Sequence, residues 1–340
     1  MTERKMATIR RIDKIEPIQG ADKIVCATVG GWKLVTAIDN GFKEGDLVVY
    51  CEIDSWIPTS VAPFLTKPGH VPKVYEGVEG EKLRTIKLRG QISQGLIMPL
   101  SVLTMVESEL IEGLDVSVPL GIVKYEPPVS AALAGVARGN FPSWIYKTDQ
   151  ERIQNLKREF PKLQEHTWEV TEKLEGSSMT AYIRDGVFGV CSRNLDLVET
   201  EGNTFWKVAR EQKLEEKLRT FGKNIAVQGE LIGEGVQDNI YKIKGHNFCL
   251  FDVFLIDTAT YMLPHERLLF AVEAGINHAP RKLGTNSIAG MTMEEVIALA
   301  DGDSEIGVKP KREGLVFKST TDHQLSFKVI SNVYLSKQKD

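Results

Sequence analysis

One lysine of the chain lies in a setting that suits covalent chemistry. Lys173 ends a strand-like run at residues 167–173, and the turn Leu174-Glu175-Gly176 follows it directly. Desolvation at the end of an apolar strand lowers the pKa of an ammonium group and so favours the neutral, nucleophilic amine. Exposed turns carry the same Lys-x-Glu-Gly pattern, so the weight of this motif depends on the residues that accompany it.

Four clusters of polar or aromatic residues follow this lysine along the chain. Arg193 ends a strand-like run, where its forked guanidinium suits a phosphate or a sugar edge. Glu230 is the one acid of an apolar run, and a buried acid is costly unless it meets a cation. Residues 248–254 are rich in phenylalanine, and Glu313 and Lys328 lie on the last two strand-like runs. Each cluster alone also fits a core strand with a surface charge.

The order of these clusters resembles the covalent nucleotidyltransferase superfamily, which includes ATP-dependent ligases and mRNA capping enzymes. Lys173-Leu174-Glu175-Gly176 is similar to its nucleophile motif, and the match covers most of residues 150–335. The other matching positions are Ser192-Arg193, Glu230, Phe251-Asp252, the run from Glu313 to Lys318, and Lys328. A β-rich module ahead of this half, with residues 148–155 between them, narrows the resemblance to nick-sealing RNA ligases that carry an N-terminal OB module.

The resemblance implies a three-step reaction. Lys173 would attack the α-phosphate of ATP, release pyrophosphate and carry AMP as a phosphoramidate. AMP would then pass to the 5′-phosphate of an RNA strand, and a neighbouring 3′-OH would displace it to seal the break. All three steps are in-line transfers at phosphorus, so the protein mainly positions groups and neutralises charge.

The resemblance also implies roles for the residues around the nucleophile. Glu230 and Glu313 would hold a hydrated Mg²⁺ or Mn²⁺. Lys328, with Lys318 as a second candidate, would bind α-phosphate oxygens. The other candidates are Arg193 for the ribose or the incoming 5′-phosphate, Arg152 for the polynucleotide or the triphosphate end, Glu175 for a sugar or the metal shell, Glu172 for the adenine amino group, and Phe251 for stacking on the base.

The last motif departs from the family pattern. That motif usually carries two lysines separated by one residue, whereas Ser326 and Ile330 flank Lys328 at the two available positions. Lys318 and Lys337 are the nearby lysines that remain as candidates for the second cation. Which group completes the phosphate clamp is therefore left open by the sequence.

Hydrophobic patterning predicts two domains of different type. Short β-branched runs broken by turn residues predict an all-β, OB-type barrel in residues 1–125, and a Pro-, Gly- and Ala-rich stretch predicts a linker at 126–145. Residues 146–340 mix patterns and predict an α+β nucleotidyltransferase domain built on antiparallel sheets. Its expected helices are 150–160, 204–220, 265–274 and 291–301. Its expected strands are 167–173, 178–192, 225–232, 247–256, 313–318 and 325–330.

Composition narrows the classes of protein further. The 340 residues include 42 Lys and Arg against 46 Asp and Glu, which gives a formal net charge of -4. Because the chain as a whole is not basic, a surface that binds nucleic acid has to be a local cluster of basic residues. Residues 87–91, as one strand with alternating basic side chains on one face, are a candidate for it, although a solvated strand face explains the same pattern. No stretch approaches the roughly 18 apolar residues of a membrane span, and the charged first residues indicate no secretory signal. We therefore expect an intracellular protein, in the cytoplasm or a host cytoplasm, with reduced cysteines and no membrane partner.

Several functions remain open at this stage. The expected partner is nicked or broken RNA, including an RNA/DNA hybrid duplex, and the sequence indicates no obligate protein partner. A DNA ligase or a GTP-dependent capping-type enzyme would use the same residues, although most such enzymes place the OB module after the catalytic domain. A non-catalytic RNA-binding protein with a decayed second domain is the alternative from another class, against which the intact Lys173, Glu230 and Glu313 argue.

Overall fold

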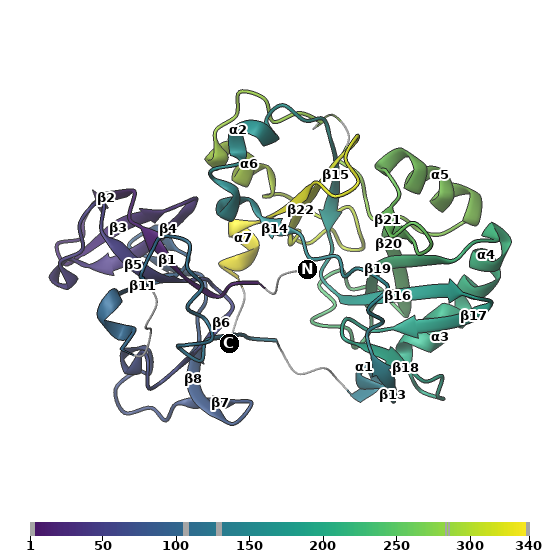
Figure 1. Cartoon of the computed structure of the whole chain (residues 1–340), viewed down its shortest axis with the longest axis horizontal. Coiled ribbons are helices and arrows are strands. Elements are labelled where there is room, and N and C mark those ends of the chain that lie inside the picture. The colour runs from purple at the N-terminus through teal and green to yellow at the C-terminus, as the bar shows by residue number, and fades with distance from the viewer. Residues whose placement is uncertain (1–3, 105–108, 127–130, 283, 285, 338–340) are drawn as a thin grey trace. The chain divides into compact units, whose positions relative to one another are not determined.

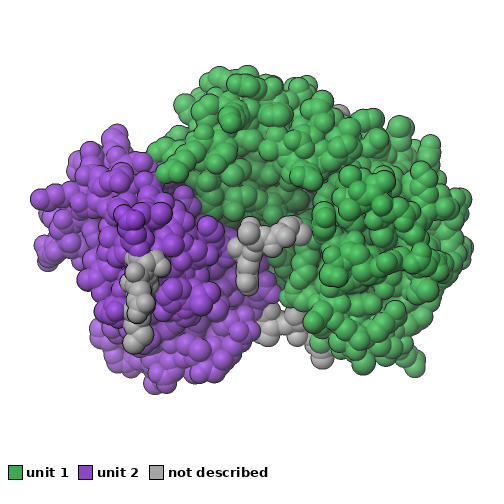
Figure 2. Space-filling view, in the orientation of Figure 1, with its two compact units in different colours: residues 1, 128–340 green, residues 2–127 purple. Residues whose placement is uncertain are grey.

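The chain divides into two compact units, Thr2–Pro127 and Pro128–Asp340 (Figure 2). The computed structural model describes residues 4–104, 109–126, 131–282, 284 and 286–337. In this described part of the chain, no helix is long and apolar enough to cross a membrane.

The N-terminal unit is built from small antiparallel sheets, as its short apolar runs predict (Figure 1). One sheet contains β1 (Ala7–Arg11), β5 (Leu47–Cys51) and β11 (Leu96–Pro99); a second contains β2 (Lys14–Pro17), β3 (Ile24–Val29) and β4 (Trp32–Ala37). A third contains β12 (Val123–Lys124), β6 (Ser55–Pro58), β8 (Val78–Lys82) and β7 (Lys73–Tyr75), and β9 (Ile86–Leu88) pairs with β10 (Gln91–Ser93). The 3-10 turns are η1 (Ile38–Asn40), η2 (Pro63–Leu65) and η3 (Leu100–Val102). Ile9, Val49 and Met98 meet in a shared core.

Residues 87–91 do not form the single strand that the sequence analysis expected. β9 ends at Leu88, and Arg89 and Gly90 have φ of 48° and 84° before β10 begins. This left-handed pair is the backbone of a tight hairpin turn. Lys87 and Arg89 therefore belong to a strand and its turn and do not line one strand face.

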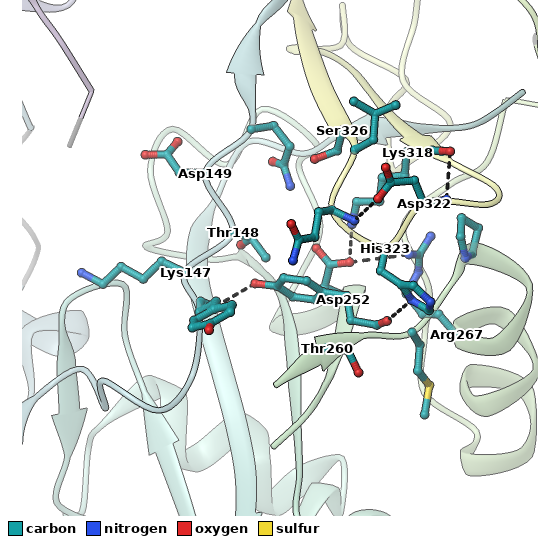
Figure 3. Close-up of a pocket in the computed structure, with 18 of the residues that line it drawn as sticks. Lys147, Thr148, Asp149, Asp252, Thr260, Arg267, Lys318, Asp322, His323 and Ser326 are labelled. Carbon is teal, nitrogen blue, oxygen red and sulfur yellow. Dashed lines mark hydrogen bonds and ion pairs between the residues drawn. The ribbon is translucent and has the colours of Figure 1, made fainter. Parts of the chain in front are cut away.

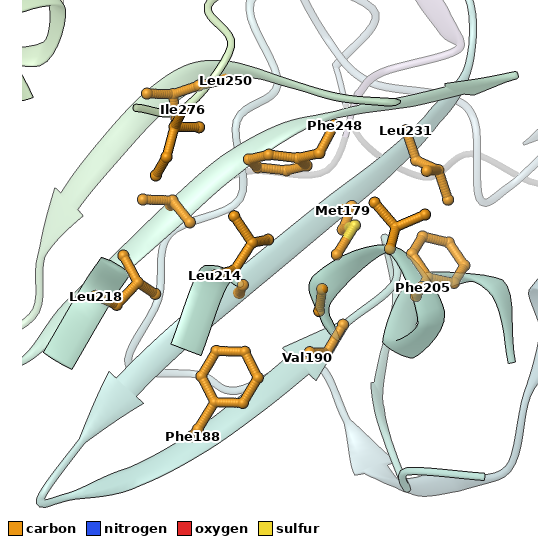
Figure 4. Close-up of a cluster of buried hydrophobic side chains, with 14 of the residues drawn as sticks. Met179, Phe188, Val190, Phe205, Leu214, Leu218, Leu231, Phe248, Leu250 and Ile276 are labelled. Atoms are coloured by element: carbon orange, nitrogen blue, oxygen red, sulfur yellow. The ribbon is translucent and has the colours of Figure 1, made fainter. Parts of the chain in front are cut away.

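The second unit contains a seven-stranded antiparallel sheet. Its order is β13 (Ala137–Asn140), β18 (Leu195–Leu197), β17 (Val187–Cys191), β16 (Ser177–Arg184), β19 (Ile225–Gly233), β20 (His246–Leu255) and β21 (Thr260–Tyr261). The helices that accompany this sheet are α1 (Ala131–Ala134), α3 (Thr204–Glu211), α4 (Leu214–Phe221) and α5 (Pro264–Ala274). Side chains of α3 to α5 pack with the apolar side chains of one sheet face, where Met179, Phe205, Leu214 and Phe248 lie in a single buried cluster (Figure 4). The other face carries a smaller buried cluster that includes Tyr182 and Phe254.

A four-stranded sheet completes the second unit. Its order is β14 (Glu151–Arg152), β23 (Ser326–Ile330), β22 (Gly314–Ser319) and β15 (Trp168–Lys173); β14 and β23 are parallel and the other pairs antiparallel. The short helices η4 (Ile153–Leu156), α2 (Phe160–Leu163), α6 (Met293–Leu299) and α7 (Asn332–Leu335) accompany it. Trp168, Val170, Phe317 and Phe327 share a core on one face. Strand side chains alternate, so the other face carries the residues between them, including Lys173.

Three local expectations differ from the structure. Residues 150–160 are not one helix, because Glu151 and Arg152 pair with β23 and tertiary pairing overrides the helical pattern. The helix expected at 204–220 is two helices, separated where Lys213 takes a left-handed φ of 53°. The expected linker 126–145 is shorter, because β13 pairs with β18 and Ile145 is buried; residues 127–130 lie outside the described part of the chain.

We expect Phe205→Ala to destabilise the second unit by about 3 to 5 kcal/mol, because Phe205 is 1% exposed and its removal leaves a cavity beneath the sheet. Chemical denaturation measures the change. Val187→Ala, at a side chain 57% exposed in the same sheet, is the control and should change stability by less than about 0.5 kcal/mol. Equal losses in both variants would contradict the assigned core.

Candidate active site

Lys173 projects from the end of β15 into a group of carboxylates. Its Nζ donates to Oε1 of Glu313, the residue just before β22, at 2.6 Å. Gly176 packs the following turn against β19: a Cβ at this position would lie 2.4 Å from the carbonyl oxygen of Leu231 and 2.9 Å from Cγ of Glu230. Only glycine fits at this position, and the close packing that it allows brings Lys173 and Glu230 near one another.

The charge state of Lys173 differs from the expectation. Burial by itself lowers the pKa of this amine, but the charges of Glu313 and Glu230 and the hydrogen bond to Glu313 outweigh burial, so the pKa of Lys173 is raised. Burial also raises the pKa of Glu230, to about 8, against the attraction of Lys173. With these neighbours Lys173 is an ammonium ion, and a nucleophilic role requires it to lose a proton.

Glu230 and Glu313 fit the ligand preference of a hard divalent cation. Both are carboxylates, and the raised pKa of Glu230 reflects burial together with the nearby negative charge of Glu313. A bound cation would favour the ionised form of Glu230. The described residues contain no cluster of three or more His, Cys, Asp or Glu side chains able to hold a metal. A cation here would therefore keep several waters, as Mg²⁺ usually does.

A second group of residues gathers three cations. Asp149 accepts from Arg193 at 3.1 Å through Oδ2 and from Lys328 at 3.3 Å through Oδ1. Arg152 lies beside Lys328 in the parallel register of β14 and β23 and is 5% exposed. The structure thus brings together Arg152, Arg193 and Lys328, to which the sequence analysis assigned separate contacts with phosphate, ribose or polynucleotide. Asp149, which that analysis did not assign a role, joins two of them; its only signal was its place in the segment 148–155.

Two tyrosines hold Glu175, the acid within the lysine motif. The backbone N–H of Glu175 donates to the hydroxyl of Tyr241 at 2.7 Å, and Tyr334 donates from its hydroxyl to Oε2 of Glu175 at 2.6 Å. Burial raises the pKa of Glu175, and the hydrogen bond from Tyr334 opposes that change. Tyr334 lies on α7, 159 residues from Glu175, and no motif in the sequence marked either tyrosine.

Glu172 does not join the group around Lys173. Alternation along β15 puts it on the side of Val170, and its Oε2 accepts from the backbone N–H of Glu305 at 3.0 Å. The expected contact with an adenine amino group therefore has no support in the position of this side chain. Phe251 is half-buried on β20, and Phe248 and Phe254 belong to other buried clusters, which leaves Phe251 as the aromatic candidate nearest the charged residues.

Lys318 also differs from its expected role. Its Nζ forms an ion pair with Asp252 and donates to the carbonyl oxygen of Phe251, both at 2.6 Å. Asp252 also pairs with Arg267 at 3.5 Å, and Arg267 pairs with Glu169. Lys318 is thus committed to a buried ion network that joins the two sheets and is not available for a phosphate. Burial accounts for the fall of its pKa to about 8.

His278 lies against this network as a neutral imidazole. Its Nε2 accepts from Nε of Arg267 at 3.1 Å, and its Nδ1 then donates to the carbonyl oxygen of Ala279 at 2.7 Å. Burial, followed by the positive charge of Arg267, lowers the pKa of His278 to about 4. Protonation would put a further charge beside Arg267, Lys318 and Arg281.

Comparisons with known proteins agree with this architecture. The RNA ligase family model matches residues 166–330, and an OB-fold domain family matches residues 6–100. A Naegleria gruberi RNA ligase variant solved with ATP and Mn is 44% identical, with a TM-score of 0.92 over 98% of this chain and 99% of that chain. Another variant, solved with AMP and Mn, gives the same values. The same ligase with PPi is 45% identical, with a TM-score of 0.90 over 98% and 99%. A comparison with curated protein sequences found no match.

An OB-fold domain followed by a lysine-centred cleft between antiparallel sheets defines a covalent nucleotidyltransferase of the ligase type. The chain belongs to the RNA ligase family. The predicted family, the N-terminal OB fold and RNA ligation as the reaction are confirmed.

We expect acidification to remove stability through His278. The pKa of the imidazole is near 6.5 in the unfolded chain and about 4 in the folded one, so between these values only the unfolded chain binds the proton. The free energy of unfolding therefore falls as pH drops from about 6.5 to 4. This contribution is about 2 to 3 kcal/mol. Unfolding of wild type and His278→Asn from pH 7.5 to 4 measures it: the stability advantage of wild type should shrink as pH falls. An advantage that does not depend on pH would contradict the assignment.

Proposed function

We propose that this RNA ligase seals 3′-OH/5′-phosphate breaks by way of an AMP group carried on Lys173. The observation that carries the proposal is the position of Lys173, whose Nζ lies 2.6 Å from Glu313 and beside Glu230 at the end of a strand. Naegleria gruberi RNA ligase has been solved with ATP, with AMP and with PPi, which are the substrate, the transferred group and the leaving group of such a reaction.

In the first step the neutral amine of Lys173 attacks the α-phosphorus of ATP. A nitrogen–phosphorus bond forms, and the bond from the α-phosphorus to the bridging oxygen breaks as pyrophosphate leaves. In the second step a 5′-phosphate oxygen of RNA displaces the lysine. In the third, the 3′-OH attacks this 5′-phosphorus and loses its proton, and AMP leaves. Each step exchanges one bond at phosphorus, so positioning and charge neutralisation supply the catalysis.

The cations of the second group suit the phosphates of these steps. Arg193 and Lys328 already converge on the two oxygens of one carboxylate, Asp149, and the same convergence suits two oxygens of a phosphate. Arg152, beside Lys328 in register, is better placed than Lys318 to complete the clamp that the last motif leaves open. Phosphate would displace Asp149 as the shared anion.

Glu230 and Glu313 are the residues that would hold Mg²⁺ or Mn²⁺. The cation would supply charge neutralisation at phosphate oxygens and weaken the hold of the carboxylates on the Lys173 proton. Glu313 is the nearest acceptor for that proton, because its Oε1 already receives the hydrogen bond from Nζ. Glu175, held by Tyr241 and Tyr334, is the carboxylate that we assign to the ribose hydroxyls of ATP.

The RNA substrate that we propose is a nicked or broken strand held on a duplex, including an RNA/DNA hybrid. The local basic residues of the N-terminal unit, such as Lys87 and Arg89, suit contacts with the backbone of a duplex. Sealing of a nicked duplex, a nicked hybrid and free single strands by one preparation separates these substrates, and equal rates on all three would rule out a need for duplex.

We expect Lys173→Ala to abolish covalent labelling, because it removes the nitrogen that bonds to phosphorus. The protein is incubated with α-phosphate-labelled ATP or GTP and Mg²⁺ or Mn²⁺, denatured, and checked for label. Wild type and Lys207→Ala, which truncates an exposed lysine on α3, should label with ATP. Label from GTP would favour a capping-type enzyme. The absence of label on wild type would contradict the proposed function.

We expect Tyr334→Phe to raise the KM for ATP in self-labelling about tenfold, because the change removes only the hydroxyl that orients Glu175. The rate at saturating ATP should change much less. Initial rates of label incorporation over a range of ATP concentrations give both values, and an unchanged thermal midpoint controls for folding. A KM equal to that of wild type would show that Glu175 does not need Tyr334.

A further inference from the structure

A cavity of about 440 Å³ lies in the second unit, near the start of β15 and away from Lys173 at the end of that strand. Figure 3 shows residues that line it. The segment 146–151, the strand β21 and the connection between β22 and β23 line it. Its floor includes Lys318, which pairs in register with Glu169, four residues before Lys173. This spacing corresponds to about 13 Å along the strand. Lys173, Glu230 and Glu313 are not among the lining residues, so the cavity is separate from the reaction centre.

The floor of this cavity carries charges that neutralise one another. Lys318 and Arg267 supply two positive groups, and both pair with Asp252 (Figure 3). Arg267 also pairs with Glu169. Because each buried cation already has a carboxylate, the floor offers no uncompensated charge to a phosphate. The cavity therefore suits an uncharged group that is flat or polar.

The wall of the cavity has an aromatic side chain fixed at its edge. Tyr146 is 45% exposed, and its ring lies 5.2 Å from that of Phe254. The backbone oxygen of Tyr146 accepts from Nε2 of Gln228 and from the hydroxyl of Tyr261, both at 2.8 Å. These two bonds fix the backbone of the segment, and Thr260 is a further residue of the wall. A fixed tyrosine with polar neighbours is a surface on which unpaired bases stack.

The cavity adjoins the phosphate-binding cations. Asp149 lines the cavity and also binds Arg193 and Lys328, so it is the shared border between the two sites. A nucleotide whose phosphate replaces Asp149 at these cations would have its base within reach of the cavity. The base would have to be unpaired, because a paired base stays in the stack of its helix.

We propose that this cavity binds an unpaired nucleobase of the RNA next to the break. The inference rests on the proposed ligase function and refines its substrate class: a break whose flanking nucleotide is single-stranded is bound more tightly than a fully paired nick. The adenine of ATP is the other source of a base, and the experiment below separates the two.

The test uses the full-length protein and a pre-adenylylated RNA strand, which needs no ATP for sealing. Two substrates are compared, one with the nucleotide beside the break paired and one with it unpaired. Tyr146→Ala should raise the KM for the unpaired substrate about tenfold or more and leave the paired substrate within about twofold. Tyr146→Phe keeps the ring and should restore the preference. Thr260→Trp fills the cavity from the short strand β21 and should act like Tyr146→Ala.

Three results would overturn the inference. If Tyr146→Ala changes the KM for both RNAs equally, or for neither, the cavity does not bind an unpaired base. A rise in the KM for ATP in self-labelling, with RNA sealing unchanged, would assign the cavity to ATP. Leu269→Ala, a surface truncation on α5 at a side chain 60% exposed, controls for general damage. If wild type labels with ATP and the Tyr146 variants seal both RNAs as wild type does, only this inference is refuted; if wild type does not label, the ligase mechanism itself is refuted.

Discussion

The alternation of side chains along β15 is the constraint on which the rest of the second unit depends. Trp168 and Val170 enter the core of the small sheet, so Glu169 and Lys173 point to the opposite face. One of these two carries the proposed chemistry, and the other anchors the ion network that joins the sheets. A shift of one residue in register would bury the lysine in the apolar core, and the packing of Trp168 against Phe317 and Phe327 opposes such a shift.

Paired charges occur both around Lys173 and in the ion network beneath the cavity, with different consequences. At the proposed reaction centre, Lys173 is held by carboxylates that keep it protonated, so the proposed cation and the proposed nucleophile compete for the same two acids. Beneath the cavity, Glu169, Arg267, Asp252 and Lys318 neutralise one another within the protein. Buried pairs of this kind add little net stability, but breaking one leaves an uncompensated charge. The network therefore fixes how the two sheets meet.

Local charge, rather than net charge, decides what this protein can bind. The chain has a formal charge of -4, yet Arg152, Arg193 and Lys328 gather at one place in the second unit. Asp149 joins two of these cations and shows the geometry in which they can share one anion. In the absence of such an anion, three cations this close would repel one another.

The sequence by itself determined the family, the domain order and the lysine proposed as the nucleophile, because residue types in a fixed order along strands are a local property. Lys173, Glu230 and Glu313 come together in the structure as that order implied. The partners that Lys318 and Glu172 have in the structure were not foreseen, because the face of a strand and the partner across the sheets depend on register and packing. The bond from Tyr334 to Glu175 spans 159 residues and that from Lys328 to Asp149 spans 179. Only the tertiary structure decided these contacts, since no local pattern encodes a partner so distant in the chain.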